Sequence, residues 1–156
     1  MNIFVLDLDP KLASQYHNDR HVVKMILETA QILCTTHHNL GNHDVPYRST
    51  HKNHPCTAWT RKSFDNYKWL EKLGLCLCEE YTFRYEKIHK SQEIIENLPD
   101  PDLDQFGLTE FALAMPEEYQ IPNDPVTSYR LYYKRGKSHL ASWKKRGKPF
   151  WWNKFN

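Results

Sequence analysis

Apolar residues recur along most of the chain at helical spacing, and three prolines mark where the predicted helices begin. Asp9-Pro10, His54-Pro55 and Asp124-Pro125 each place a capping residue before a proline, which favours the first turn of a helix. The periodicity predicts long helices over residues 10–38, 55–88 and 125–143, with Gly136 as a possible break, and a short helix over 91–98. No segment shows a convincing strand pattern. The sequence therefore predicts an all-α fold, a compact domain of three principal helices with a basic, aromatic C-terminal tail.

The remaining segments are predicted to connect these helices. Residues 2–8 form an apolar run that suits a short strand or an extended lead-in, and residues 39–52 are polar and loop-like. Residues 99–123 are predicted to be mostly loop, with a short helical piece near 111–113. Repeats and linker-like stretches are absent from the sequence, so we expect residues 1–156 to form a single domain.

Composition excludes several classes of protein. The chain has no run of eighteen apolar residues and no secretion signal at its start, so we expect a cytoplasmic protein that does not enter a membrane. Its four cysteines are irregularly spaced, as is typical of reduced, structural thiols. The chain has only five glycines, and its sequence contains no glycine-rich phosphate-binding loop.

Charge is distributed unevenly along the chain. The whole sequence has 21 Lys and Arg against 19 Asp and Glu, but residues 127–156 contain nine of the basic residues and none of the acidic ones. Residues 1–126 therefore carry twelve basic and nineteen acidic residues, a net charge of −7, and the last thirty residues carry +9. Because Trp and Phe are interleaved with these cations, the tail is suited to bind phosphates and to stack on bases. Nucleic acid or a nucleotide is the expected partner, and the oligomeric state cannot be predicted.

The first long helix presents a polar stripe formed by His17, His21, Lys24 and Glu28, opposite an apolar face. Asp19 falls on the apolar side, where a carboxylate has to be paired or has to face a cleft. Either structural pairing or a catalytic role fits this position, with His21, Arg20, His54 or Arg61 as the expected partners. The predicted catalytic residues are Asp19 and His21.

The other candidate residues are predicted to bind phosphate or substrate. The set combines basic and aromatic side chains from the first helix, the start of the second and the tail: His17, Arg20, Lys24, His54, Arg61, Arg130, Lys134, Lys137 and Trp151. Lys24 and Glu28 also have the spacing of an exposed ion pair, and Lys24 in a desolvated cleft would instead be a nucleophile. The tail aromatics can equally anchor the tail on the core.

His17 and His21 also have the i, i+4 spacing found in many zinc-binding helices, and His51, His54 and Cys56 are further possible ligands. Because these residues complete no known zinc spacing, we predict neither a metal nor a cofactor.

The order of features resembles a known family. A short apolar N-terminus leads into a helix containing Ala13-x-Gln15, followed by a loop, a second long helix, a proline-rich acidic connection, a third helix and a basic C-terminus with Tyr-Tyr and Trp-Trp pairs. This order resembles the phage T4-type pyrimidine-dimer DNA glycosylase/endonuclease family, whose members are small all-α enzymes. Asn53-His54-Pro55 also looks like the Asn-His-Pro step of cellular relatives of that group. The chain is similar as well to small proteins carried by phages, which implies a phage product in an infected host cell.

The resemblance implies a mechanism. In that family the N-terminal α-amine attacks C1′ of the damaged nucleotide and forms a Schiff base, and a Glu on the first helix assists. Here Met1 is followed by Asn2, which is larger than the residues that favour removal of the initiator Met, so the amine is displaced by one residue. Val23 occupies the position that matches the family's Glu, which leaves Asp19, one turn earlier, as the substitute.

Three functions fit these residues. The leading hypothesis is an enzyme that cleaves an N-glycosidic bond in a nucleic acid or nucleotide, with Asp19 as acid/base or electrostatic stabiliser. A duplex substrate would need its base flipped out of the helix. The first alternative is a non-catalytic protein that binds and sequesters a nucleotide, for instance against host defence. The second alternative is a metal-dependent phosphohydrolase that uses the histidines.

Overall fold

The computed structural model describes residues 1–155, and these residues form helices and loops with no β-strand. The all-α prediction is confirmed. The six α-helices and the single π-helical turn of the described chain are α1 (Pro10–Tyr16), α2 (Asp19–Asn39), α3 (Pro55–Thr60), α4 (Phe64–Tyr85), α5 (Gln92–Asn97), α6 (Pro125–Leu131) and η2 (Tyr132–Gly136). Three short 3-10 turns follow the same numbering: η1 (Glu117–Tyr119), η3 (Ser138–Leu140) and η4 (Trp152–Lys154).

The first predicted helix is broken into α1 and α2. Asn18 adopts an extended conformation, and its side-chain oxygen accepts a hydrogen bond from the backbone N–H of His21 at 2.8 Å, which caps α2. Asn and Ser cap helices in this way because their short side chains reach the free N–H groups of the first turn. The expectation of one continuous helix over 10–38 was therefore wrong at residues 17 and 18.

A second cap breaks the next predicted helix in the same manner. Ser63 accepts from the backbone N–H of Asn66 and starts α4, so α3 and α4 are separate helices. Two further expectations were also wrong. Residues 111–113 are not helical, and α6 ends at Leu131, where the chain continues as the π-helical turn η2 rather than as a helix to residue 143.

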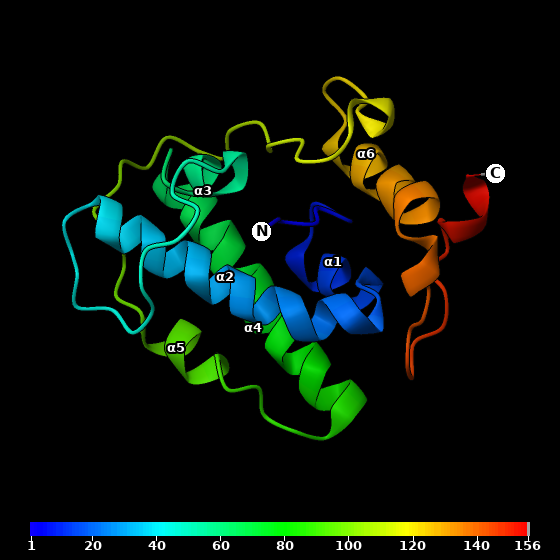
Figure 1. Ribbon diagram of the computed structural model, residues 1–156, viewed down its shortest axis with the longest axis horizontal. Coiled ribbons are helices and arrows are strands. Elements are labelled where there is room, and N and C mark those ends of the chain that lie inside the picture. The colour runs from blue at the N-terminus through cyan, green and yellow to red at the C-terminus, as the bar shows by residue number, and fades with distance from the viewer. Residues whose placement is uncertain (156) are drawn as a thin grey trace.

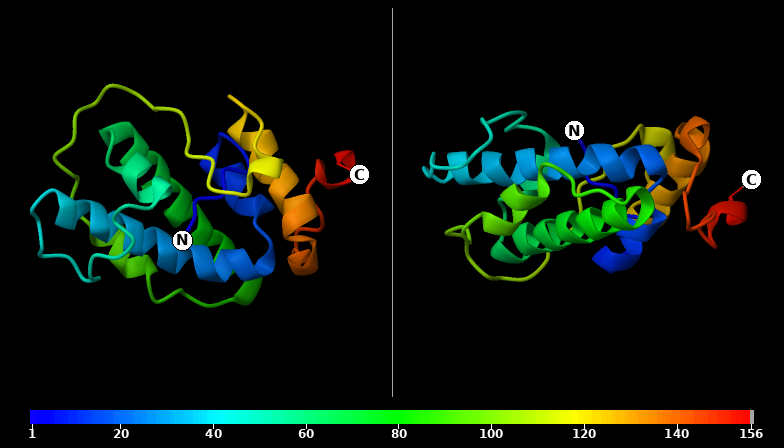
Figure 2. Two further views of the ribbon diagram at one scale, coloured as in Figure 1. Left: turned by 45° about the horizontal axis from the view of Figure 1, so that its top comes forward. Right: turned by 90° about the horizontal axis from the view of Figure 1, so that it is seen from below.

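Helices α2 and α4 cross and form the centre of the structure. Figure 1 shows α4 behind α2, with α3 and α5 towards one end of the pair and α6 with the C-terminal segment towards the other. The right-hand view of Figure 2 shows α2 and α4 as two layers. The buried side chains between them include Val22, Ile26, Leu33, Tyr67, Leu70 and Leu77. The extended N-terminal segment is also buried, because Ile3 to Leu6 are at most 4% exposed.

Gly74 lets α4 approach α2 and α5 closely. A Cβ atom at this position would lie 2.8 Å from the Thr29 methyl group on α2 and 3.1 Å from Cδ1 of Ile95 on α5. Both distances are shorter than ordinary van der Waals contacts between carbons. A glycine inside a helix costs about 1 kcal/mol in helix propensity, and the close crossing explains its presence here.

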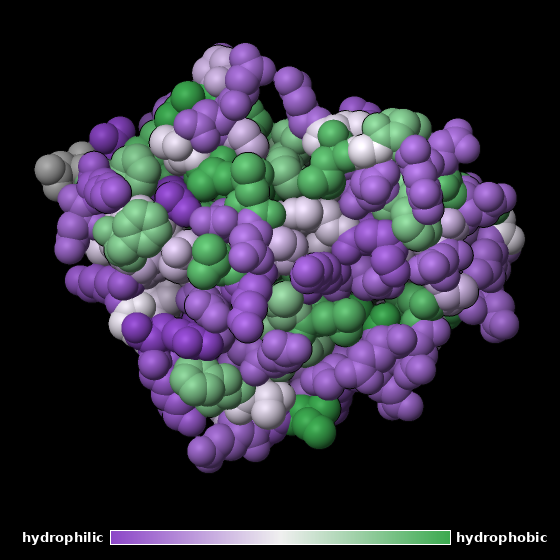
Figure 3. All heavy atoms as spheres, turned by 180° about the vertical axis from the view of Figure 1, so that it is seen from behind, coloured by the Kyte–Doolittle hydropathy of each residue, from purple (hydrophilic) through white to green (hydrophobic). Residues whose placement is uncertain are grey.

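The surface mixes hydrophilic and apolar groups. Seen from behind, apolar side chains form separate patches between hydrophilic ones (Figure 3). Within the described chain, no helix is both long and apolar enough to span a membrane. The four cysteines are all free thiols, as the sequence predicted.

We predict that Gly74→Ala destabilises the protein although alanine is the better helix former. The added methyl group should cost about 1–3 kcal/mol through overpacking, which offsets or exceeds the gain in helix propensity of about 1 kcal/mol. Urea unfolding of both proteins measures the difference. Lys72→Ala, on the exposed face of α4, is the control and should change stability by less than about 0.5 kcal/mol. A more stable Gly74→Ala protein would contradict the close crossing.

Candidate functional site

The N-terminal segment is fixed by the side chain of Asn2. Its Nδ2 donates to the carbonyl of Ala114 at 2.9 Å, and its Oδ1 accepts from the backbone N–H of Ile3 at 2.7 Å and from the hydroxyl of Tyr129 at 3.4 Å. Tyr129 is itself fully buried and donates to the carbonyl of Ala112. These bonds hold the first residues of the chain in place between α2 and the loop that precedes α6.

The α-amine of Met1 lies beside a buried carboxylate of α2. Its nitrogen is 3.0 Å from Oε1 of Glu28, a residue that is only 7% exposed. The other carboxylate oxygen lies 3.8 Å from Nζ of Lys24, so the predicted Lys24–Glu28 ion pair is confirmed. A carboxylate at hydrogen-bond distance from an amine can accept a proton from the ammonium form and so generate a nucleophile.

The amine opens into a pocket of about 190 Å³ between the N-terminal segment, α2 and η2. Its lining residues are Met1, Asn2, Phe4, His21, Lys24, Met25, Glu28, Tyr132 and Lys137. Three of these groups are formally cationic at neutral pH, the Met1 amine, Lys24 and Lys137, and Glu28 is the one carboxylate among them. Because cations outnumber the single carboxylate, the pocket is suited to an anionic ligand such as a phosphate.

Tyr132 forms one wall of this pocket and is held by aromatic contacts. Its ring stacks on Tyr119 with centroids 5.3 Å apart, and the ammonium of Lys137 lies 5.3 Å from its centroid. A Cβ atom at Gly136 would lie 2.6 Å from the Tyr132 ring, so only glycine leaves room for the ring in this turn. The π-helical turn therefore places both Tyr132 and Lys137 at the pocket.

His21 also lines the pocket and has an unusually low pKa. Its ring stacks on Phe4 with centroids 4.4 Å apart, and its Nδ1 lies 2.6 Å from the hydroxyl of Tyr133. Burial, together with smaller electrostatic effects of His17, Lys137 and Lys24, lowers the pKa of His21 to about 3. The ring is neutral at physiological pH.

His17 lies one turn earlier and is completely buried. Its Nδ1 is 2.7 Å from the carbonyl oxygen of Ala13, and its Nε2 has no hydrogen-bond partner within the described residues. Burial lowers the pKa of His17 to about 4, with a smaller effect from the charge of Arg84. Because it has no exposed surface, His17 is not positioned to bind phosphate directly.

Asp19 is engaged by Arg84 and by the C-terminal segment. Its Oδ1 lies 3.0 Å from Nη1 of Arg84 and accepts the backbone N–H of Lys144 at 2.8 Å, while its Oδ2 accepts the hydroxyl of Ser142 at 2.6 Å. None of the four partners expected from the sequence is the one observed, because Arg84 is more than sixty residues away in sequence. These contacts favour an anchoring role, and the catalytic role of Asp19 stays a prediction.

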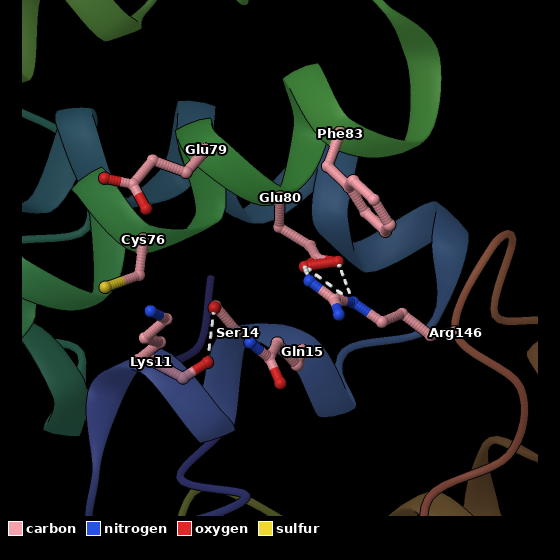
Figure 4. A pocket seen from close by; sticks show the side chains of 8 residues that line it. All are labelled: Lys11, Ser14, Gln15, Cys76, Glu79, Glu80, Phe83 and Arg146. Atoms are coloured by element: carbon pink, nitrogen blue, oxygen red, sulfur yellow. Dashed lines mark hydrogen bonds and ion pairs between the residues drawn. The ribbon is translucent and has the colours of Figure 1, made fainter.

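Arg84 belongs to a buried cluster of charges between α1, α4 and the C-terminal segment. Besides Asp19 it contacts the carboxylate of Glu80 at 3.3 Å, and Arg146 donates to the same carboxylate at 2.7 Å. Figure 4 shows Arg146 reaching Glu80 at one end of a hollow of about 250 Å³ between α1 and α4. Both Glu80 oxygens are already bonded to guanidinium groups, so this hollow offers no free carboxylate for chemistry.

Of the other binding residues predicted near the first two helices, His54 lies near the pocket, whereas Arg20 and Arg61 do not line it. His54 caps α3, and its Nδ1 accepts from the backbone N–H of Cys56. Burial lowers the pKa of His54, and the positive charge of the Met1 amine lowers it as well. His54 is therefore near the amine. Arg20 is exposed, whereas Arg61 donates to the carbonyl of Lys52, and neither is among the pocket's lining residues.

The predicted tail residues are brought to the pocket only in part. Lys137 lines it, but Arg130 donates to the carbonyl of Leu6, pairs with Asp7 at 3.1 Å and packs against aromatic rings. Lys134 lies over the ring of Trp152, and Trp151 is 1% exposed. Trp151 is therefore a core residue in this structure, as one of the two sequence interpretations of the tail allowed.

Six of the nine lining residues were not among the site residues predicted from the sequence: Met1, Asn2, Phe4, Met25, Glu28 and Tyr132. A signal for Glu28 was present, since it shares a helix stripe with His21 and Lys24 at seven and four residues' distance. Within the described residues, no group of three or more His, Cys, Asp or Glu side chains is arranged to hold a metal ion.

The fold and the site together define a small all-α protein with an α-amine and a carboxylate paired in a cation-lined pocket. The family model described as pyrimidine dimer DNA glycosylase matches residues 1–103, about two-thirds of the sequence, and the chain belongs to this family. The match covers the amine, α2 and Arg84 with its carboxylate partners Asp19 and Glu80, and it ends before α6 and the basic tail with Arg146. Searches of curated proteins and of solved structures gave no significant match.

We predict that the protein loses stability steeply below pH 6.5 because His17 and His21 are buried in the neutral form. Their pKa values are about 4 and about 3 in the folded protein, against 6.5 for an exposed histidine. Between these values the unfolded state binds more protons, so the free energy of unfolding falls as the pH falls, by about 1.4 kcal/mol per unit for each residue.

Urea unfolding at pH 6.5 and 4.5 tests this expectation. His17→Gln should lose about 2–3 kcal/mol less than the wild type over that interval. His139→Gln is the control, because His139 is exposed and should leave the loss unchanged. Parallel pH curves for wild type and His17→Gln would contradict a buried, neutral His17.

Proposed function

We propose that the protein cleaves the N-glycosidic bond of a damaged pyrimidine nucleotide in DNA and that the α-amine of Met1 is the nucleophile. The observation that carries the proposal is the 3.0 Å contact between this amine and the buried Glu28 carboxylate. Membership of the pyrimidine dimer DNA glycosylase family supports DNA as the partner and a pyrimidine dimer as the lesion. In this proposal Glu28 has the catalytic role that the family resemblance had assigned to Asp19.

The covalent steps balance with these two groups. Glu28 accepts a proton from the ammonium of Met1, and the amine nitrogen forms a bond to C1′ while the bond from C1′ to the base breaks. The base leaves with the electron pair and takes up the proton from Glu28. The nitrogen then loses a second proton, its lone pair forms a C=N bond to C1′, and the C1′–O4′ bond opens. That second proton ends on O4′, and the product is a protonated imine.

The pocket also has the groups that such a substrate needs. The ammonium groups of Lys24 and Lys137 are suited to neutralise phosphates next to the damaged nucleotide. Because the amine lies in a pocket of only about 190 Å³ beside buried groups, a nucleotide has to leave the base stack to reach it. Tyr132 and Phe4 offer aromatic surfaces along the walls.

We predict that borohydride traps a covalent complex between the protein and a duplex containing an abasic site. Reduction of the imine turns the C=N bond between C1′ and the Met1 nitrogen into a stable single bond. In protein that retains Met1, peptide mapping by mass spectrometry should place the adduct on the N-terminal peptide. Glu28→Gln, which keeps the shape but cannot accept a proton, should slow trapping by about 10²-fold or more.

Two controls make the assignment specific. Lys24→Arg keeps the charge beside Glu28 without a nucleophilic amine, and it should still be trapped. A Gly-Ser extension before Met1 moves the amine away from Glu28 and should abolish trapping. An adduct on Lys24 would overturn the proposed nucleophile. Tight binding of lesion DNA that is returned unchanged would instead favour the alternative of a non-catalytic binding protein.

Comparing the stability and cleavage rate of Asp19→Asn with those of Glu28→Gln distinguishes an anchoring role of Asp19 from a catalytic one. If Asp19 anchors the C-terminal segment, Asp19→Asn should lower the free energy of unfolding by about 1–3 kcal/mol, because the buried Arg84 charge loses one of its two carboxylate partners. Single-turnover cleavage measured well below the unfolding temperature should then stay within about threefold of wild type, far from the loss expected for Glu28→Gln. A loss of about 100-fold with unchanged stability would establish the catalytic role predicted for Asp19.

A further inference from the structure

His21 lines the pocket, and among the described residues its ring forms a hydrogen bond through only one of its two nitrogens. Nδ1 contacts the hydroxyl of Tyr133 at 2.6 Å, and the ring lies flat against Phe4 at an interplanar angle of 26°. Within residues 1–155, no group lies within hydrogen-bond distance of Nε2. The ring is therefore held from two sides while one nitrogen remains available to a ligand.

The hydrogen bonds of Tyr133 determine which nitrogen of His21 carries the proton. The backbone N–H of Asn18 donates to the Tyr133 oxygen at 3.4 Å, and an amide N–H can only donate. Tyr133 is 1% exposed, and in the described chain its hydroxyl has only His21 and Asn18 as partners. The hydroxyl proton must go to Nδ1 of His21, because a buried O–H group without an acceptor costs about 1–3 kcal/mol. Nδ1 is then an acceptor, and the proton of the neutral ring is on Nε2.

We infer that His21 presents a fixed Nε2–H donor to an oxygen of the substrate's sugar–phosphate backbone, and that Tyr133 is the positioning residue that sets this tautomer. The inference rests on the proposed function for the identity of the ligand, but not for the tautomer itself. It gives His21 a binding role through a hydrogen bond rather than the acid/base role predicted from the sequence.

The surroundings of the ring support a donor that does not titrate. The charged and titratable groups around it come from three parts of the chain. They are His17, Lys24 and Glu28 on and before α2, Tyr132, Tyr133 and Lys137 on and after η2, and the Met1 amine. Within the described residues no carboxylate contacts the ring, so nothing offsets the burial that lowers its pKa. His17 provides an internal contrast, because its Nδ1 faces the carbonyl of Ala13 and must carry the proton.

The first test needs neither a variant nor DNA. Long-range proton–nitrogen NMR spectra of protein with ¹⁵N-labelled histidine distinguish the two tautomers of a neutral ring. Between pH 8 and pH 5 we expect His21 to carry its proton on Nε2, His17 to carry it on Nδ1, and neither signal to titrate. A proton on Nδ1 of His21, or a titration midpoint near 6.5, would overturn the inference whatever the protein's activity.

The second test measures binding to a duplex with a tetrahydrofuran abasic analogue, which lacks the C1′ hydroxyl group and cannot form an imine. His21→Gln keeps a side-chain N–H group, whereas His21→Leu keeps only the bulk. We expect His21→Leu to weaken binding by about tenfold or more and His21→Gln by less than about threefold, as for loss of one hydrogen bond to a charged oxygen. Equal binding by His21→Leu and wild type would overturn the proposed contact.

Tyr133→Phe tests the positioning role separately. Without the hydroxyl, the spectra should show both tautomers of His21, and affinity for the tetrahydrofuran duplex should fall although the pocket's side chains are unchanged. Unfolding curves identify any variant that fails to fold. If wild-type protein shows the expected tautomers but neither binds nor cleaves lesion DNA, the proposed function fails while the assignment of the His21 tautomer stands.

Discussion

The buried guanidinium of Arg84 is the interaction on which the arrangement of the structure depends. It lies where α1, α2 and α4 meet the C-terminal segment, fully buried, and it donates to the carbonyls of Gln15 and His17 as well as to Asp19 and Glu80. The two carbonyls lie at the end of α1. They lack hydrogen-bond partners within the helix because the helix stops there. One side chain thus stabilises both the break between α1 and α2 and the buried carboxylates around it.

The same cluster determines where the basic tail can lie. Asp19 binds Ser142 and Lys144, and Glu80 binds Arg146, so three residues of the C-terminal segment are fixed by carboxylates of the acidic N-terminal part. The preceding turn η2 and the residue that follows it place Tyr132 and Lys137 at the pocket, and Tyr133 of η2 contacts His21. Removing a partner of a buried charge is far more costly than losing a surface ion pair. The wall of the pocket therefore depends on charges that lie outside the pocket.

Much of the fold could be predicted from the sequence, because helical periodicity and Asp-Pro or His-Pro steps are local signals. The breaks at Asn18 and Ser63 were missed, since apolar spacing continues across both and only the capping side chains mark them. In the site, the stripe with His21, Lys24 and Glu28 was visible. The partner of Asp19 was not, because Arg84 is brought to it by the crossing of helices, which no local pattern encodes.

The pairing of the Met1 amine with Glu28 shows why a residue-by-residue transfer from the family placed the carboxylate elsewhere. Retaining Met1 moves the amine by one residue, about 3.5 Å in an extended chain, whereas Glu28 lies five residues beyond Val23, about 7.5 Å along a helix axis. The shift of the amine and the shift of the carboxylate therefore differ in length. A side chain five residues further along α2 also points to another face of the helix. Asn2 accounts for the difference, because its partly buried hydrogen bonds fix the N-terminal segment against Ala114 and thereby direct the amine to Glu28. The position of the amine beside Glu28 is thus set by tertiary contacts of the second residue rather than by the register of the first helix.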